Sequence, residues 1–120
     1  VCKRDRWCGV ARGAGELRKE SAQRADVAEK AAQGALDVGK KDGYRISASV
    51  GDRAGVLRAM GRADGAGPHT VVSSRKKAYT AASLRRATSD LADIIAKQPS
   101  LQAMREMNDS ILMVGRGLPI

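Results

Sequence analysis

The chain has few of the large side chains that usually fill a protein interior. Its 120 residues include no phenylalanine, one tryptophan and two tyrosines. The core must therefore be built from Ala, Val, Leu, Ile and Met, and small side chains bury little area each, at about 25 cal/mol per Å² of apolar surface. We expect one domain with one modest core, stabilised by association with further copies of the chain.

Cysteine and histidine are scarce as well, which limits metal chemistry. Cys2 and Cys8 are the only cysteines, and His69 is the only histidine. The two cysteines are compatible with a disulfide in an oxidising compartment or with two free thiols. A zinc site would need two more ligands, so we do not expect one.

Acidic residues are outnumbered by basic ones. The chain has 22 Lys and Arg against 13 Asp and Glu, a net charge of +9. Such a charge attracts nucleic acid, anionic lipid or acidic proteins. The sequence carries no nucleic-acid-binding signature, and the aromatic residues that stack on bases are almost absent. We therefore do not expect a nucleic acid as partner.

No apolar run is long enough for a signal or membrane helix, so we expect no membrane insertion. A bacterial cytoplasmic location and an exported one both stay open. Residues 1–16 show no helical or strand periodicity, and they are rich in basic residues. We interpret them as a basic arm without fixed structure, ahead of a domain over residues 17–120.

The domain begins with a predicted helix and hairpin. The helix is expected over residues 19–41 and ends at Gly43. Its buried stripe is predicted to comprise Ala25, Ala28, Ala32, Ala35 and Leu36. Residues 44–50 alternate between apolar and polar side chains, and residues 56–60 supply a second strand. The turn Asp52-Arg53-Ala54-Gly55 between them predicts an antiparallel hairpin.

The second half is predicted to be mostly helical. After a loop at residues 64–67, Pro68 begins a helix that runs to about Arg85. This helix is expected to bury Val71 or Val72, Ala78, Ala81 or Ala82, and Leu84. A shorter helix, capped by Thr88 or Ser89, carries Leu91, Ile94 and Ile95. A further turn begins at Ser100 with Leu101 and Met104, and residues 111–114 form a buried strand. The four methionines are interpreted as core residues. The fold class is α+β with helices packed on an antiparallel sheet.

Four segments resemble one known family. They are Asp52-Arg53-Ala54-Gly55, Arg62-Ala63-Asp64-Gly65-Ala66, Lys77-Ala78-Tyr79-Thr80-Ala81 and Gly117-Leu118-Pro119-Ile120. On these segments the chain resembles the GlcG/HbpS-like proteins (haem-degrading domain, PduO C-terminal-like). The resemblance implies a profilin- or PAS-like layout and assembly into oligomers. The chain departs from the family pattern at Arg116, which stands between two glycines that are adjacent in the family. Family members also continue with a final hairpin and helix, which the resemblance implies are missing after Ile120.

The family also implies a ligand. Some members bind haem, and PduO-type relatives bind haem or a corrinoid. The resemblance therefore implies haem as the first candidate cofactor, with a corrinoid as the alternative. His69 is the candidate axial ligand of the iron. The alternative is a solvent-facing residue at a helix N-terminus.

Other residues around His69 are candidates for binding the ligand. Asp64, Gly65 and Gly67 lie in a loop whose backbone N–H groups could bind a carboxylate, or form a plain turn and helix cap. Arg62 precedes this loop, and Lys77 lies on the family motif as a candidate anion ligand. Arg75 and Lys76 are interpreted as part of a solvated helix face.

We expect an oligomeric ligand-binding or accessory protein, more readily than an enzyme. One alternative is an enzyme or enzyme subunit acting on a small organic carboxylate, with Lys77 or His69 as acid or base. Another is a basic interaction protein whose N-terminal arm binds an acidic partner or nucleic acid.

Overall fold

The structure is a computed structural model that describes residues 25–115 and residue 117. The predicted basic arm and the first residues of the predicted helix lie outside the described residues. So do Arg116 and the end of the Gly-Leu-Pro-Ile motif. None of the described helices is long and apolar enough to cross a membrane.

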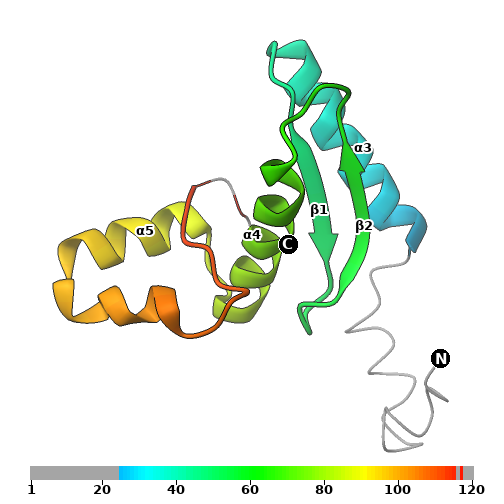
Figure 1. Cartoon of the computed structure of the whole chain (residues 1–120). Coiled ribbons are helices and arrows are strands. Elements are labelled where there is room, and N and C mark those ends of the chain that lie inside the picture. Colours follow the sequence, from blue (N-terminus) through cyan, green and yellow to red (C-terminus); the bar gives the residue numbers. More distant parts are fainter. Residues whose placement is uncertain (1–24, 116, 118–120) are drawn as a thin grey trace, which may run out of the picture.

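The described chain forms two layers of helix around a pair of strands, with a helical lobe at one side (Figure 1). The elements in chain order are helix α3 (Ala25–Lys41), strands β1 (Ser47–Gly51) and β2 (Leu57–Arg62), helices α4 (His69–Leu84) and α5 (Thr88–Lys97), and the 3-10 helix η1 (Pro99–Glu106). β1 and β2 are antiparallel neighbours in a two-stranded sheet. The predicted α+β class with helices on an antiparallel sheet is confirmed.

α3 covers the apolar face of the strand pair. Ala28 and Ala32 are buried against Val50, and the flanking alanines Ala48 and Ala59 pack around them. Gly39 is buried as well, because a Cβ there would lie 2.8 Å from Cδ1 of Ile46. The prediction that Ala25 and Ala35 are buried is wrong, since both are exposed. Two strands are too narrow to cover the full predicted stripe.

α4 covers the opposite, polar face of β1. The hydroxyls of Ser47 and Thr70 are 2.7 Å apart, and those of Ser49 and Ser74 are also 2.7 Å apart. The predicted alternation of β1 is therefore confirmed. Its polar side is not left to solvent, because paired hydroxyls satisfy one another at a helix–sheet contact.

The second lobe has a small core of its own. Leu91, Ile95, Ile111 and Met113 are buried together, and Tyr79, Leu84, Leu101 and Met104 pack against them. Two methionines thus serve the core as predicted. The same prediction is wrong for Met60 and Met107, which are 42% and 59% exposed.

Ile111 and Met113 lie in this core, but residues 111–114 are not a strand and Val114 is 53% exposed, which corrects the prediction of a buried strand. No ladder partner for them exists among the described residues. Two fully buried threonine side chains bind their backbone instead. Thr80 Oγ1 accepts the N–H of Leu112 at 2.8 Å, and Thr88 Oγ1 donates to the carbonyl of Val114 at 2.7 Å.

Thr88 therefore has a different role from the predicted one. Ala87 is the N-cap of α5, and no side chain caps that helix. The Thr88 hydroxyl also accepts the N–H of Gly117 at 2.7 Å, so it is committed to the C-terminal segment. The predicted cap at Ser100 is wrong too, since η1 begins at Pro99 after Gln98.

Candidate functional site

The Asp64–Gly67 loop links the end of β2 to the start of α4. The N–H of Ala66 donates to the carbonyl of Ala63 at 3.0 Å, which closes a four-residue turn. Gly65 occupies the third position with φ of 75°, a conformation that favours glycine. Asp64 and Gly65 are exposed, whereas Ala66 is buried. No hydrogen bond joins the Asp64 carboxylate to another residue in the part of the chain that the structure describes.

Arg62 holds this loop in place. Its Nε donates to the carbonyl of Ala66 at 3.0 Å, and its Nη2 donates to the same oxygen. A carbonyl leaves the guanidinium charge uncompensated, unlike a carboxylate. The predicted ligand residue thus fixes the loop and still presents positive charge beside it.

Arg45 reaches the same loop from the segment just before β1. A Cβ on Gly65 would lie 2.9 Å from Nη1 of Arg45, so the guanidinium lies directly against that glycine. Residue 45 was not among the predicted site residues. A signal for it exists in the hairpin register, because the N–H of Ala63 donates to the carbonyl of Ile46 at 2.9 Å. This pairing brings Arg45 next to Asp64.

His69 is the first residue of α4 and is exposed. Its ring folds back over Gly67, where a Cβ would lie 2.6 Å from Cε1 and 2.8 Å from Nδ1. The Gly67 carbonyl is bound by Thr70, through the N–H at 3.0 Å and Oγ1 at 2.6 Å. A side chain at residue 67 would displace the imidazole, so this glycine sets the position of the ring.

Lys77 lies away from this cluster. It is half-buried on α4, and its carbonyl would be 3.0 Å from a Cβ on Gly117. Eight residues of helix separate it from His69, a rise of about 12 Å. The structure thus brings together Arg62, Asp64, Gly65, Gly67 and His69, and leaves Lys77 near the C-terminal segment. We name the cluster of Arg45, Arg62, His69 and the Asp64–Gly67 loop the basic loop site.

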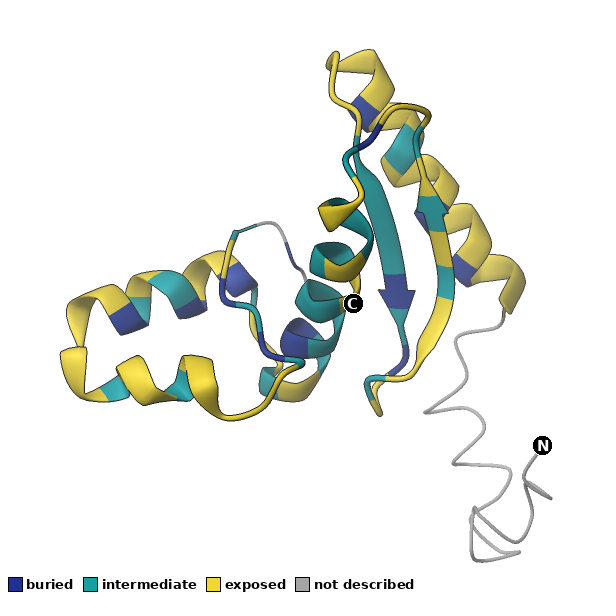
Figure 2. Cartoon of the chain, in the orientation of Figure 1, coloured by how far each residue is buried: buried dark blue, intermediate teal, exposed yellow. Residues whose placement is uncertain are grey.

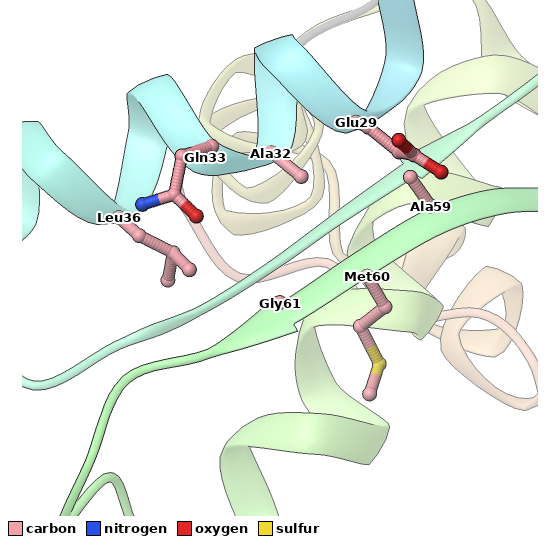
Figure 3. Close-up of a pocket in the computed structure, with 7 residues that line it drawn as sticks. All are labelled: Glu29, Ala32, Gln33, Leu36, Ala59, Met60 and Gly61. Carbon is pink, nitrogen blue, oxygen red and sulfur yellow. The ribbon is translucent and has the colours of Figure 1, made fainter. Parts of the chain in front are cut away.

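A hollow in the structure lies elsewhere, between α3 and β2 (Figure 3). Its volume is about 260 Å³, and none of its lining residues belongs to the basic loop site. They are Glu29, Ala32, Gln33, Leu36, Ala59, Met60 and Gly61. Pockets for drug-sized ligands usually measure roughly 300–1,000 Å³, so this hollow lies below that range. Among the described residues, no three His, Cys, Asp or Glu side chains gather as metal ligands.

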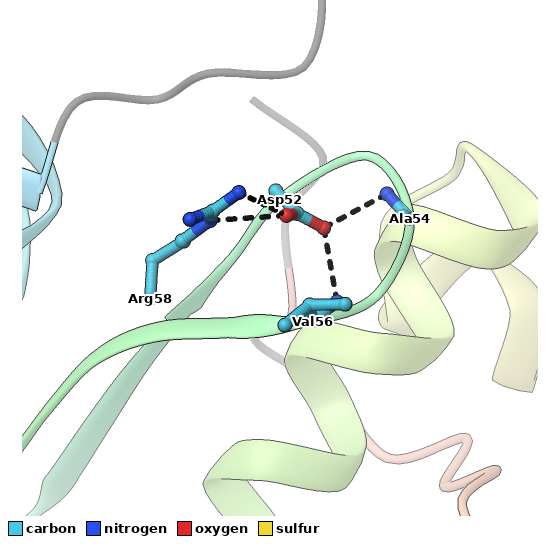
Figure 4. Close-up of polar contacts among 4 residues, drawn as sticks. All are labelled: Asp52, Ala54, Val56 and Arg58. Atoms are coloured by element: carbon cyan, nitrogen blue, oxygen red, sulfur yellow. Dashed lines mark hydrogen bonds and ion pairs between the residues drawn. The ribbon is translucent and has the colours of Figure 1, made fainter. Parts of the chain in front are cut away.

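The hairpin loop at the other end of β2 contains a second Asp and Gly (Figure 4). Asp52 is 5% exposed, and its Oδ1 accepts the N–H groups of Ala54 at 2.9 Å and Val56 at 3.0 Å. Its Oδ2 accepts Arg58 Nε at 3.0 Å and Nη2 at 2.9 Å. A register shift after Val50 leaves Arg58 as the extra residue of a bulge, which directs its side chain to Asp52. The Asp52 carboxylate is thus fully occupied by groups of its own hairpin.

Comparison with known proteins places the chain in a family. Residues 24–120 match the family model described as "Haem degrading protein HbpS-like". A crystal structure of HbpS is 35% identical, has a TM-score of 0.77, and is matched over 88% of this chain and 72% of its own. A double mutant of Streptomyces reticuli HbpS gives 35% identity, a TM-score of 0.77, and coverage of 88% and 70%.

A less similar solved structure also matches this chain. The Klebsiella pneumoniae protein ORFY is 27% identical with a TM-score of 0.64, over 73% of this chain and 62% of its own. The chain matches no curated protein. The predicted family resemblance is confirmed: this chain belongs to the HbpS-like family of haem-degrading proteins.

Proposed function

We propose that the chain is a haem-binding accessory protein that works as an oligomer, and that the basic loop site binds the haem. His69 is the axial ligand in this proposal. Arg45 and Arg62 bind the carboxylates, and the two glycines let the ligand approach the backbone. The family name supports a relation to haem.

One observation carries the proposal: two guanidinium groups and the sole imidazole surround one glycine loop. Arg45 lies against Gly65, Arg62 donates to Ala66, and the His69 ring lies over Gly67. Neither arginine has an ion pair with a described residue. Guanidinium groups bind carboxylates in a planar, two-pronged geometry, so a propionate is a suitable ligand for them.

The arginines suit the carboxylate edge of haem and His69 suits its iron, but none of them forms an apolar wall against the ring. The site supplies positive charge and one ring nitrogen, and the first turns of α4 add Val72, which is 49% exposed. A porphyrin needs apolar walls on both sides. We propose that another copy of the chain supplies the second wall. Bound haem would supply its iron chemistry, whereas this chain's residues bind and orient it.

The test is a haem titration followed at the Soret band, with wild type and His69→Ala. We expect His69→Ala to shift the band and weaken binding, because the axial nitrogen is lost. Arg75→Ala is the matched control, since it removes an exposed side chain from the same helix. Identical spectra and affinities for wild type and His69→Ala would exclude His69 as the ligand. A parallel titration with cobalamin tests the corrinoid alternative.

A small organic carboxylate is a second candidate ligand for the same arginine pair. In an enzyme of that kind, Lys77 would be a poor acid or base, because about 12 Å of helix separates it from the loop. Turnover of a carboxylate that is lost in His69→Ala and kept in Lys77→Ala would support an enzyme at this loop. Displacement of haem by small carboxylates without turnover would support the binding protein.

A further inference from the structure

α3 carries an apolar stripe that faces away from its own sheet. Val27 and Val38 are 50% and 60% exposed, and Ala31 and Gly34 between them are exposed too. The steps from 27 to 31, 34 and 38 alternate between four and three residues. This is the spacing with which one helix packs along another in a coiled coil. We name these four residues the α3 stripe.

The stripe is open on the described molecule. Successive residues turn by 100° around a helix, which puts the α3 stripe on one side of the buried row of Ala28, Ala32 and Gly39. Glu29 and Gln33 lie on the other side, where α3 meets β2. No described atom lies within 4 Å of a Cβ placed on Gly34. Figure 2 shows α3 exposed over most of its surface, with buried residues restricted to its sheet side.

The charges beside the stripe determine the direction of a partner helix. Lys30 and Asp37 are both exposed and each directly precedes a stripe residue, so they lie on one flank, seven residues apart. If a second α3 ran antiparallel, the same flanks would meet, and Lys30 of one copy would face Asp37 of the other, twice by symmetry. A parallel partner would place uncharged Ala35 beside Lys30 instead. Asp37 also accepts a bond from Gln33 at 2.8 Å, which leaves its second oxygen for a cation.

We propose that the α3 stripe is a self-association surface, on which a second copy of this chain packs its own α3 antiparallel about a two-fold axis. In this register Val27 meets Val38 of the other copy, and Ala31 meets Gly34. The small central pair lets the helix axes approach to the short end of the usual range of about 8–10 Å. The surface is self-complementary in shape and in charge, as a two-fold interface requires.

The proposal deepens the oligomeric part of the proposed function, and it does not depend on haem. Its subject is one helix on the opposite side of the sheet from α4, so the two can fail separately. Haem titration tests the basic loop site, whereas molar mass tests the α3 stripe.

The first test is a charge exchange read by light scattering and sedimentation. Lys30→Asp places two like-charge pairs across the interface, and the dissociation constant should rise about tenfold. Lys30→Asp combined with Asp37→Lys restores opposite charges in the antiparallel arrangement, and the wild-type mass should return. Lys40→Asp changes the charge equally on another side of α3 and should leave the mass unchanged.

The second test cannot fail through unfolding. Lysine favours helix over glycine by roughly 0.5–1 kcal/mol, and the space around residue 34 is open, so Gly34→Lys should fold at least as well as wild type. It puts a cation into the centre of the proposed contact. We expect a molar mass of at least twice 12.7 kDa for wild type and a lower mass for this variant.

The outcomes separate the two proposals. Loss of association in Lys30→Asp and Gly34→Lys, with recovery in the double exchange, supports the α3 stripe. If all of these variants have the molar mass of the wild-type oligomer, the α3 stripe is not the self-association surface, although the chain still forms an oligomer. A wild-type monomer at all concentrations overturns both. Binding of haem by such a monomer, weakened in His69→Ala, would keep His69 as the ligand and exclude a second copy as the second wall.

Discussion

The two loops that flank β2 contain similar residues but differ in how these residues bind one another. Each has an Asp, a glycine with positive φ and a nearby arginine: Asp52, Gly55 and Arg58 at one end, Asp64, Gly65 and Arg62 at the other. In the hairpin loop the carboxylate and the arginine bind each other. In the basic loop site the arginine binds a carbonyl and the carboxylate is exposed. A loop that satisfies its own charges is structural, whereas one that leaves them exposed can bind a ligand.

The largest expected effect is the loss of the Asp52 carboxylate. Asp52→Ala removes four polar contacts at a buried position, and it leaves two backbone N–H groups and one guanidinium without their acceptor. We expect a loss of about 2–3 kcal/mol in the free energy of unfolding, measured by urea denaturation. Asp52→Asn keeps one acceptor for the N–H groups and should lose less. Equal stability of Asp52→Ala and wild type would contradict the structural role of this loop.

Gly55 and Gly65 allow the stability of the two loops to be compared. Gly55 has φ of 78° and a Cβ there would lie 2.7 Å from the Tyr79 ring, whereas a Cβ on Gly65 would meet only the end of Arg45. Each alanine substitution costs about 1 kcal/mol for the left-handed conformation. Gly55→Ala should cost roughly twice that, because the ring belongs to the core of the second lobe. Thermal unfolding of both variants measures the difference, and a larger loss for Gly65→Ala would contradict it.

The smallest expected effect on stability is at Asp64. Its carboxylate is exposed, and no described residue binds it, so Asp64→Asn should change the free energy of unfolding by less than about 0.5 kcal/mol. The same change removes a negative charge beside Arg45 and Arg62. We therefore expect haem to bind somewhat more tightly, by about twofold to fivefold. Weaker binding would mean that Asp64 itself contacts the ligand.

The elements that were predicted correctly are those fixed by neighbours in the sequence. The alternation of Ile46, Ala48 and Val50 and the chemistry of the Asp52–Gly55 turn are enough to predict the hairpin. Pro68 and Gly43 likewise mark a helix start and a helix end, as observed. The family followed from short motifs that are local in the same way, and the fold class followed from the order of the predicted helices and strands.

The errors concern contacts between distant parts of the chain. Residues 111–114 have a strand-like pattern, yet Thr80 and Thr88 bind their backbone, more than 20 residues away in sequence. The Thr88 hydroxyl is bound to this segment and does not provide the cap of α5 that its position in the sequence had suggested. Arg45 was not predicted as a site residue for the same reason, because only the pairing of β1 with β2 brings it to Gly65. Nothing in a short window of sequence encodes such partners.

The central claim is that the two loops differ in function as well as in bonding, and a matched pair of arginine variants tests it most directly. Arg45 lies at the basic loop site and Arg53 in the hairpin loop, and both are exposed. Haem titrations of Arg45→Ala and Arg53→Ala, followed at the Soret band, should show about fivefold weaker binding for Arg45→Ala and no change for Arg53→Ala. Equal affinities for the two variants, or a loss confined to Arg53→Ala, would contradict the claim.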